Sequence, residues 1–440
     1  MRIRLNRHLE TARSSLFLVP MLSVATAVLL GEVGLAFDRR LENSAALPMV
    51  FTSTVSSARA VLTTVAAATI SFAGVAFSVS LLVIQLGSSQ YSPRVVHTLF
   101  RDPFNKRVMG IVVGTFTYSL IVLRSVRSPF EDGGDPVIPN LSVAGAVVFG
   151  VAAILAVVAF INHSAHSMDI SEILRRVARE SIDSTSSDWS PDAKVNASES
   201  RVPAVGSTSV VIRFDRAGWV QQVDLDAAVH CADPGGTVAL HTASGRYAVE
   251  GTPICTISPA PTDSDSAVER GRAAVGLGAT RTMQQDPSYG LRQLADVALK
   301  ALSPGISDPT TAQDAIFHST SVLAHLLHRS PPPGVIDGPN GRQLQLEQQP
   351  THDDLVRLTF DEVRRAARTQ PLVCVYLLES LELLHESLSH AGLTDRLAVL
   401  EQEAQLVVAG CAASTELLRV DVAVVEEAYR MRFGPPSRGG

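Results

Sequence analysis

Five charged residues in the C-terminal half of the chain have side chains that could hold a small polar ligand. They are Arg281, Asp286, Arg292, Asp296 and Asp308. Arg292, Asp296 and Lys300 follow at four-residue intervals, so on a helix they share one face and form a charge ladder of a kind that is usually solvated. A ligand site requires Arg281, Asp286 and Asp308 to fold close to this ladder. The residue types therefore favour either a ligand site or a structural polar cluster.

A second group is neutral and polar and lies within an apolar stretch. No Asp, Glu, Lys, Arg or His occurs in the 34 residues from Ala60 to Pro93. Within this stretch four polar residues recur every seven positions, which places them on one helix face: Thr64, Ser71, Ser78 and Gln85. Such a stripe could line a pore, which needs hydrogen-bonding groups, or pack against another helix, as small residues often do in membranes. Three small residues, Ala60, Ala67 and Gly74, form another face for packing.

Histidines and cysteines give weaker signals. His163 and His166 lie three apart, and a later segment holds Asp314, His318, His325 and His328. A two-histidine metal clip or a pH sensor could be built from either set, but HExxH is absent, so we expect surface histidines, no metal site and no cofactor. The four cysteines are far apart without a CxxC pair, which indicates reduced, partly buried residues.

Composition indicates a membrane protein. The chain has 440 residues, of which 46% are hydrophobic, and its formal net charge is -6. No clustered basic excess occurs, so a general nucleic-acid partner is not expected. The sequence also contains no P-loop, dinucleotide fingerprint, nucleophile and base pair or metal triad, and an enzymatic function is therefore not favoured.

Four apolar segments predict membrane spans, at about 16–37, 61–86, 108–123 and 141–161, within a membrane domain over 1–165. Glu32 lies near the end of the first span, where we expect it to reach the interface rather than to gate transport. The N-terminal segment, the loop after the second span and the segment after the fourth span together hold eleven Lys and Arg residues, whereas the first and third loops hold five. Because Lys and Arg are enriched on the cytoplasmic side of a membrane, this distribution predicts both termini in the cytoplasm. Ser92 to Phe100 is expected to form a short interfacial helix that Asp102 and Pro103 end.

Four motifs resemble a known family: IQLGSSQYSPRVV, GTFTYSLIVLR, FINHSAHS and, from Arg281 to Ala315, RTMQQDPSYGLRQLADVALKALSPGISDPTTAQDA. They are similar to those of a bacterial family of predicted membrane proteins, defined by a domain of unknown function, with four N-terminal spans and a large cytoplasmic part. The resemblance covers most of the chain outside 181–205 and 330–352. It implies a protein of the bacterial inner membrane and no catalytic residues. Ser307 stands where the family usually has Asn.

The remainder predicts a cytoplasmic α+β part. After a juxtamembrane helix and linker over 166–205, the period-two pattern of 206–260 indicates four or five short strands in a small β-barrel-like domain. Its repeats are weakly similar to a lipoyl or biotinyl carrier, but no Lys lies between Lys194 and Lys300 to carry either group.

Residues 261–440 are expected to be helical, with an exposed loop over 330–352. Helices are predicted at 287–302, from Asp308 onward, and at 353–369, 372–391 and 393–411, with a last one reaching Arg430. A leucine stripe is predicted to form the helix-bundle core: Leu377, Leu378, Leu381, Leu384 and Leu388.

Two functions agree with this organisation. The first is an oligomeric channel or transport protein, a homo-oligomer in the lipid bilayer, with the polar stripe along its pathway and the cytoplasmic part as a gate. The second is a membrane-anchored regulatory or scaffold protein whose cytoplasmic part binds a partner or small ligand. Spans two to four contain no carboxylate, which argues against ion-coupled transport but not against conduction.

Overall fold

The structure is a computed structural model that describes residues 18–41, 54–90, 103–127, 138–166, 169–185, 189–190 and 209–434. The chain forms two compact units, Met1–Asp169 and Ile170–Gly440. We call them the membrane unit and the soluble unit and describe each by itself.

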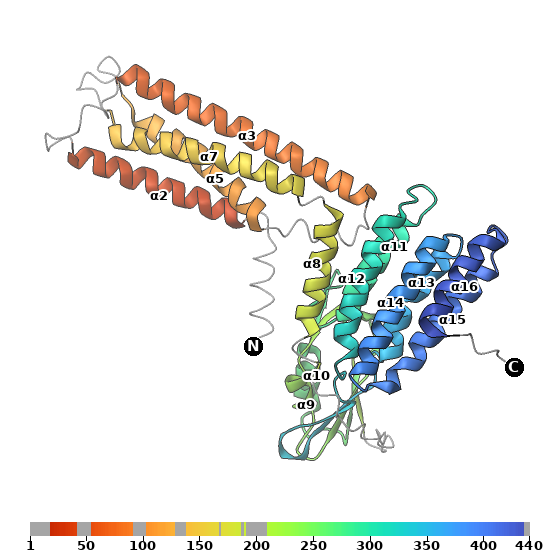
Figure 1. Cartoon of the computed structure of the whole chain (residues 1–440). Coiled ribbons are helices and arrows are strands. Elements are labelled where there is room, and N and C mark those ends of the chain that lie inside the picture. Colours follow the sequence, from red (N-terminus) through yellow and green to blue (C-terminus); the bar gives the residue numbers. More distant parts are fainter. Residues whose placement is uncertain are drawn as a thin grey trace. The chain divides into compact units, whose positions relative to one another are not determined.

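Four long helices form the membrane unit: α2 (Leu18–Leu41), α3 (Val55–Gln90), α5 (Pro103–Ser125) and α7 (Asn140–His166). They lie side by side, and α5 packs against the other three (Figure 1). All four are long and apolar enough to cross a membrane, which confirms that the four predicted apolar segments form membrane-length helices. Apart from the start of α2, the helices extend beyond the predicted apolar segments, because flanking residues continue the helical backbone.

The connection between α3 and α5 differs in part from expectation. α3 continues as a helix to Gln90, four residues past the predicted end of its span. Pro103, which was expected to mark the end of an interfacial helix, is the first residue of α5, where a proline ring is compatible with helical geometry. The interfacial helix predicted from Ser92 to Phe100 lies outside the described residues.

A buried carboxylate on α2 caps the start of α7. Asp38 is 5% exposed and accepts hydrogen bonds from the backbone N–H groups of Leu141 and Ser142, both at 3.0 Å, and from Ser142 Oγ at 2.5 Å. The first N–H groups of a helix have no partner within the helix, and a carboxylate satisfies them well. Asp38 therefore joins the first and fourth helices of the unit.

Two further polar contacts tie the same end of the membrane unit. The Arg59 guanidinium of α3 donates to the carbonyl of Val126 at 3.0 Å. Glu32 pairs with Arg124 at 3.1 Å, and both side chains are more than half exposed. The end that holds the α2 and α5 C-termini and the α3 and α7 N-termini is thus joined by contacts from every helix.

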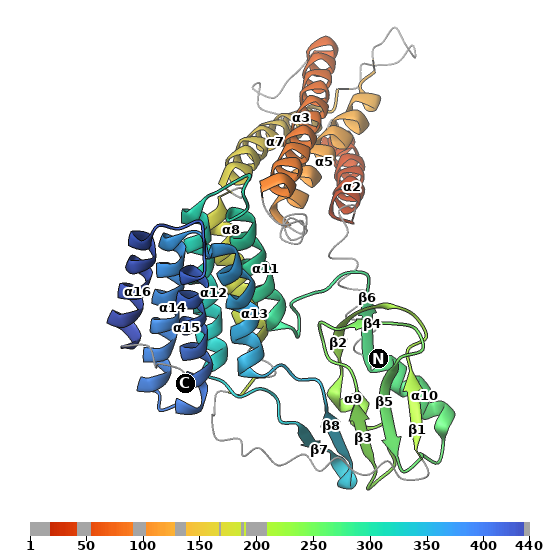
Figure 2. The ribbon, with the colours of Figure 1, turned by 90° about the vertical axis from the view of Figure 1, so that its right-hand side faces the viewer.

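Seven helices form a bundle in the soluble unit: α8 (Ile170–Thr185), α11 (Pro287–Ala301), α12 (Pro309–Leu327), α13 (His352–Ala367), α14 (Pro371–His390), α15 (Leu397–Ala412) and α16 (Arg419–Phe433). They lie side by side in Figure 2. The five leucines of the predicted core stripe are all at most 1% exposed, which confirms that the stripe is bundle core. Asp308 accepts hydrogen bonds from the N–H groups of Thr310 and Thr311 at 3.1 Å, so the predicted helix start at Asp308 is also confirmed.

Eight strands form two sheets beside the helices: β1 (Val210–Arg213), β2 (Gly218–Val223), β3 (Thr237–Leu240), β4 (Tyr247–Ala248), β5 (Pro253–Ser258), β6 (Val275–Gly278), β7 (Val335–Asp337) and β8 (Gln343–Leu346). The five-stranded sheet has the order β1-β5-β3-β8-β7, and the three-stranded sheet has the order β4-β2-β6. Both sheets contribute to one hydrophobic core, together with α9 (Leu225–Val229) and α10 (Ser264–Ala273). The five short strands within 210–258 agree with the four or five that the sequence predicted.

The segment 330–352, which the sequence indicated as an exposed loop, holds two of these strands. β8 pairs in parallel with β3, from Thr237 opposite Gln343 to Leu240 opposite Leu346. Leu344 is fully buried in the shared core. The pattern was missed because β8 is only four residues long and takes its hydrogen bonds from a strand about a hundred residues earlier. The sheet domain therefore includes residues well beyond 260.

The turn between α11 and α12 contains a strained residue. Ser307 has φ +50°, in the left-handed region that costs a side chain other than Gly about 1–2 kcal/mol, although Asn tolerates it. The family resemblance implies Asn at this position, and the positive φ explains that preference, because Asn tolerates the left-handed region better than Ser.

We expect Ser307→Asn and Ser307→Gly to stabilise the soluble unit by up to about 1 kcal/mol, because both residues tolerate a positive φ. Thermal unfolding of the full-length protein in detergent measures the effect. Ser307→Ala is the control, because it keeps a Cβ atom and offers no local hydrogen bond. A gain with Ala equal to that with Asn would contradict the strain argument.

Candidate functional site

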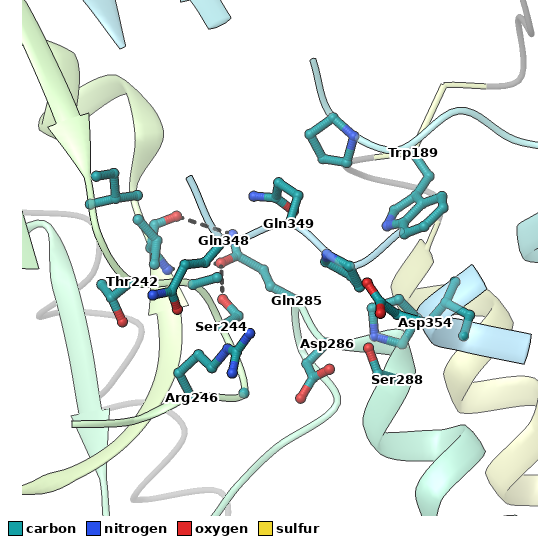
Figure 3. Close-up of a pocket in the computed structure, with 18 of the residues that line it drawn as sticks. Trp189, Thr242, Ser244, Arg246, Gln285, Asp286, Ser288, Gln348, Gln349 and Asp354 are labelled. Carbon is teal, nitrogen blue, oxygen red and sulfur yellow. Dashed lines mark hydrogen bonds between the residues drawn. The ribbon is translucent and has the colours of Figure 1, made fainter. Parts of the chain in front are cut away.

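A cavity of about 430 Å³ lies in the soluble unit between the sheets and the helices (Figure 3). Four segments that are far apart in the sequence line it: 242–246 after β3, 281–288 before and at the start of α11, 348–350 after β8, and the first turns of α13. Trp189 forms a further part of the wall. We call this cavity the cleft.

Two of the five predicted charged residues meet in the cleft. Arg281 Nε donates to Asp286 Oδ2 at 2.6 Å, and Asp286 is 4% exposed. Asp286 directly precedes Pro287, the first residue of α11, yet its side chain makes no capping hydrogen bond to that helix. The Arg281 guanidinium also lies over the ring of Tyr289 at 5.1 Å and near that of Trp219 at 5.9 Å. The buried Asp286 carboxylate is thus compensated by a cation that aromatic rings hold in place.

Gly245 allows the backbone to approach this ion pair. Its φ is +84°, and a Cβ atom there would lie 2.6 Å from Asp286 Cγ and 3.0 Å from an Arg281 guanidinium nitrogen. Both the backbone conformation and the space therefore require glycine. The loop 242–246 owes its position in the cleft wall to this close approach.

Gln285 fixes the segment before α11 to the three-stranded sheet. Its Oε1 accepts hydrogen bonds from Val223 N at 2.8 Å and from Ser244 Oγ at 3.1 Å, and its Nε2 donates to the Val223 carbonyl at 3.3 Å. Sequence reasoning did not single out Gln285, because a lone amide has no spacing signal. Its place within the motif RTMQQDPSYG was the only available indication.

Several polar side chains in the cleft wall have unused hydrogen-bonding capacity. Thr242 is 6% exposed, and in the part of the chain that the structure describes its hydroxyl makes no hydrogen bond. The side chains of Arg246, Ser288, Gln348 and Gln349 likewise have no hydrogen-bond partner among the described residues. These groups line the cleft, so a bound molecule could take up their hydrogen-bonding capacity.

The two carboxylates of the cleft, by contrast, are both satisfied. Asp286 is paired with Arg281, and Asp354 accepts hydrogen bonds from Thr351 N at 3.0 Å and Thr351 Oγ1 at 2.7 Å. The hydrogen bonds from Thr351 lower the pKa of Asp354. The groups left to bind a ligand are therefore one guanidinium, which can only donate, and two hydroxyls and two amides, which can donate or accept.

The other three predicted charged residues lie elsewhere. Arg292 on α11 pairs with Asp296 at 3.0 Å and with Glu362 on α13 at 2.7 Å, which joins two helices. The hydrogen bond from Arg292 lowers the pKa of Glu362. Asp308 caps the start of α12. It follows the C-terminal end of α11, whereas the cleft lies at the N-terminal end of that helix. The structure thus brings Arg281 and Asp286 together in the cleft and leaves Arg292, Asp296 and Asp308 in structural contacts.

The polar stripe of α3 is exposed on the membrane unit at all four positions, Thr64, Ser71, Ser78 and Gln85. The three hydroxyls donate to the carbonyls of Ala60, Ala67 and Gly74, at 2.8, 2.9 and 3.0 Å respectively. The small residues expected on another face therefore belong to the same face as the stripe. Because each of these three hydroxyls donates within its own helix, Thr64, Ser71 and Ser78 require neither water nor a polar partner as acceptor.

The candidate histidines have separate surroundings. The His163 ring contacts that of Phe104 at 4.6 Å, and His166 Nδ1 lies 2.8 Å from the Asn162 carbonyl. On α12, Asp314 accepts a hydrogen bond from Ser171 at 3.4 Å, and His328 lies between the Ala324 carbonyl and Ser387. His318, His325 and His328 are half-buried rather than freely exposed, because α8 and α14 pack against α12. Among the described residues no three His, Cys, Asp or Glu side chains cluster in a way that could hold a metal ion.

The four cysteines are free and buried, as expected. Burial raises the pKa of the thiols of Cys231, Cys255 and Cys374, to about 11, 12 and 12 respectively. These thiols are packing groups with low reactivity at neutral pH.

Three histidines should make the soluble unit less stable in acid. Burial lowers the pKa of His318, His325 and His352. Below the ordinary histidine pKa of about 6.5 the unfolded chain binds protons that the folded unit does not, so stability falls as the pH decreases. We expect the thermal midpoint to fall by a few degrees between about pH 7.5 and 5.5.

The double substitution His325→Gln/His352→Gln should reduce this pH dependence. The control is His390→Gln, at the exposed last residue of α14. Differential scanning fluorimetry of the full-length protein across the pH range provides the measurement. An unchanged slope in the double variant would refute the assignment to these residues.

Comparison with known proteins agrees with this architecture. The family described as "Predicted membrane protein (DUF2254)" matches residues 13–383. The curated relatives include "Uncharacterized protein Rv1290c" of Mycobacterium tuberculosis and "Uncharacterized protein Mb1321c" of Mycobacterium bovis, each 31% identical over 339 residues. Each match covers 76% of this chain and 64% of the relative, so the chain spans less than two thirds of the length of these relatives. No solved structure matches.

The family match includes all four membrane-length helices and every segment that lines the cleft. The resemblance that the motifs indicated is confirmed. The chain therefore belongs to the DUF2254 family of predicted membrane proteins.

Proposed function

We propose that this protein is a membrane-anchored receptor whose soluble unit binds a small polar molecule in the cleft. The observation that carries the proposal is Thr242, a residue only 6% exposed that lines a cavity of about 430 Å³ and whose hydroxyl makes no hydrogen bond in the described structure. This volume lies within the usual range of small-molecule sites, about 300–1,000 Å³. Ser288, Gln348 and Gln349 supply further unused polar groups around the same space.

The soluble unit offers a route from the cleft toward the membrane helices along the chain. Pro287 and Ser288, at the start of α11, line the cleft. α11 packs against α8, which begins at Ile170, four residues after α7 ends at His166. A ligand that shifts the start of α11 would therefore act on the helix that directly follows the fourth span. This connection supports a regulatory function.

A thermal-shift screen tests the receptor proposal. The full-length protein in detergent is heated with separate probes: nucleotides, amino acids, sugar phosphates, dicarboxylates and neutral sugars. We expect at least one probe to raise the unfolding midpoint of the wild type. Gln348→Trp, which fills the cleft from an exposed lining position, should abolish that rise. Glu269→Trp, at an exposed position on α10, is the matched control. The absence of any cleft-dependent shift would overturn the proposal.

The distribution of basic residues supports a location of the soluble unit in the cytoplasm of a bacterium. Eleven Lys and Arg residues lie in the segments assigned to the inner side, against five on the other. A green fluorescent protein fused to the C-terminus should then fluoresce, whereas an alkaline phosphatase fusion should be inactive. The opposite pattern would reverse the orientation.

An oligomeric channel is the second candidate, favoured by the exposed stripe on α3. Its hydroxyls are satisfied by carbonyls of their own helix, so the same face equally suits packing between copies of the chain. Ion flux into liposomes distinguishes the two functions, with Ser71→Leu/Ser78→Leu as the test variant. Flux that this variant abolishes would favour the channel, and no flux across several ions and pH values would remove it. A stable monomer in detergent would also argue against a pore.

A further inference from the structure

The charged side chains of the cleft differ in whether they already form ion pairs or hydrogen bonds within the protein. Asp286 is paired with Arg281 at 2.6 Å, and Asp354 accepts two hydrogen bonds from Thr351. Arg246 is an exposed residue at the same cleft, and within the described structure its guanidinium has no ion-pair or hydrogen-bond contact, although its charge contributes to the lowered pKa of Asp354. Arg246 is therefore the cleft cation whose hydrogen-bond donors are free for a ligand. A guanidinium of this kind is well suited to a phosphate or carboxylate group.

The start of α11 adds a second positive element at the same wall. Pro287 and Ser288 are its first two residues and line the cleft. The preceding Asp286 makes no capping bond, because its carboxylate is held by Arg281. The first-turn N–H groups of α11 are thus not capped by the Asp286 side chain, and the N-terminus of a helix favours an anion. The Thr242 hydroxyl, which makes no hydrogen bond among the described residues, is a further donor on the β3 side.

The side of the cleft opposite Arg246 holds aromatic and apolar groups, together with Asp354 and Ser288 (Figure 3). Figure 3 places Trp189 on the other side of the lining residues from Arg246. Trp189 is 6% exposed, with its ring 6.1 Å from that of His352, and Pro332 and Pro350 also line the cleft. A flat ring packs favourably against an indole and prolines.

We propose that the cleft binds a small organic anion in which a phosphate or carboxylate group is joined to a flat ring. The anionic group lies between Arg246, Thr242 and the start of α11, and the ring lies toward Trp189. This inference rests on the proposed receptor function and specifies its ligand class.

The two tryptophans of the chain allow a direct test. Trp219→Phe keeps an aromatic ring beside Arg281 and leaves Trp189 as the only tryptophan. Fluorescence of this full-length variant in detergent is titrated with mononucleotides, the matching nucleosides, nicotinate and inorganic phosphate. We expect at least one ring-bearing anion to quench Trp189. The uncharged nucleoside should bind at least about tenfold more weakly, and inorganic phosphate alone should not quench.

Substitutions identify the groups that bind. Arg246→Gln should weaken binding of the ring-bearing anion about tenfold or more, in keeping with the strength of hydrogen bonds to charged groups. Thr242→Val, which keeps the side-chain shape, should also weaken it. Arg216→Gln makes the same charge change at an exposed position outside the cleft and should leave binding unchanged.

Equal binding of nucleoside and nucleotide, or unchanged binding in Arg246→Gln, would overturn the anion assignment. A neutral probe that binds in the thermal-shift screen and is blocked by Gln348→Trp, with no ring-bearing anion binding, would overturn this inference and leave the receptor proposal intact. No cleft-dependent binding by any probe in either assay would overturn both.

Discussion

Gly290→Ala is expected to destabilise the soluble unit by about 1–3 kcal/mol, the usual cost of overpacking a core. Gly290 is buried in α11, where α8 approaches closely. A Cβ atom at Gly290 would collide with the Ser181 hydroxyl and lie 2.7 Å from Ser181 Cβ and 3.2 Å from Met283 Sδ. Ser181 is fully buried and donates to the Val177 carbonyl of its own helix at 2.9 Å, so it has little freedom to move.

This result would run opposite to helix propensity, which favours Ala over Gly by about 1 kcal/mol inside a helix. Gly410→Ala in α15 is the matched control, because nothing lies within 4 Å of a Cβ atom there. The control should be neutral or stabilising. Thermal unfolding of the full-length protein compares the two, and a similar gain for both would show that α8 and α11 do not pack as closely as described.

A double-mutant cycle localises the effect. Ser181→Gly should rescue Gly290→Ala, with a coupling free energy of about 0.5–3 kcal/mol for residues in direct contact. If Gly290→Ala also weakens binding of a cleft ligand, then the start of α11 and α8 are coupled as the receptor proposal requires. Additive effects of the two substitutions would refute the contact.

Arg364→Ala is expected to have the larger effect, a loss of about 3–5 kcal/mol, because it leaves a buried charge without its partner. Arg364 Nε pairs with Glu403 Oε2 at 3.2 Å, and the Glu403 side chain is 3% exposed. Arg364 also pairs with Asp361 at 2.8 Å. Arg364 on α13 thus compensates the carboxylate of Glu403 on α15.

The pH dependence of this loss has a defined sign. Burial raises the pKa of Glu403, and the adjacent Arg364 opposes that shift. In the Arg364→Ala variant the Glu403 carboxyl therefore keeps its proton in the folded state at a pH where the unfolded state releases it. Stability accordingly falls as the pH rises from the ordinary Glu pKa to the raised pKa of Glu403. The difference between variant and wild type should accordingly be smaller at pH 5 than at pH 8.

Arg365→Ala is the matched control for this experiment. Arg365 is the next residue, its side chain is 66% exposed, and it lies 3.4 Å from Asp361. Loss of such a surface pair costs about 1 kcal/mol or less. Replacing both buried partners, as in Arg364→Met/Glu403→Leu, should recover much of the loss. A loss in Arg364→Ala no larger than in Arg365→Ala would contradict the importance of the buried pair.

The sequence determined those features that depend on local pattern. Apolar length predicted all four membrane helices, because a bilayer requires about twenty apolar residues in succession. The Asp308 cap and the buried leucine stripe of α14 were predicted because capping and helical periodicity depend on residues within one or two turns. Of the candidate site, the sequence supplied Arg281 and Asp286, which lie only five residues apart.

Only the tertiary structure decided which distant residues meet. β8 takes its place in the sheet from β3, and Asp38 caps a helix that begins about a hundred residues later, so neither contact leaves a local signal. Thr242, Arg246, Gln285 and Trp189 likewise converge on the cleft from separate segments. Residue types and spacing establish which chemistry is available in this chain. Packing decides which groups are used up in structural contacts, as Arg292 is, and which, like Thr242 and Arg246, retain the capacity to bind a ligand.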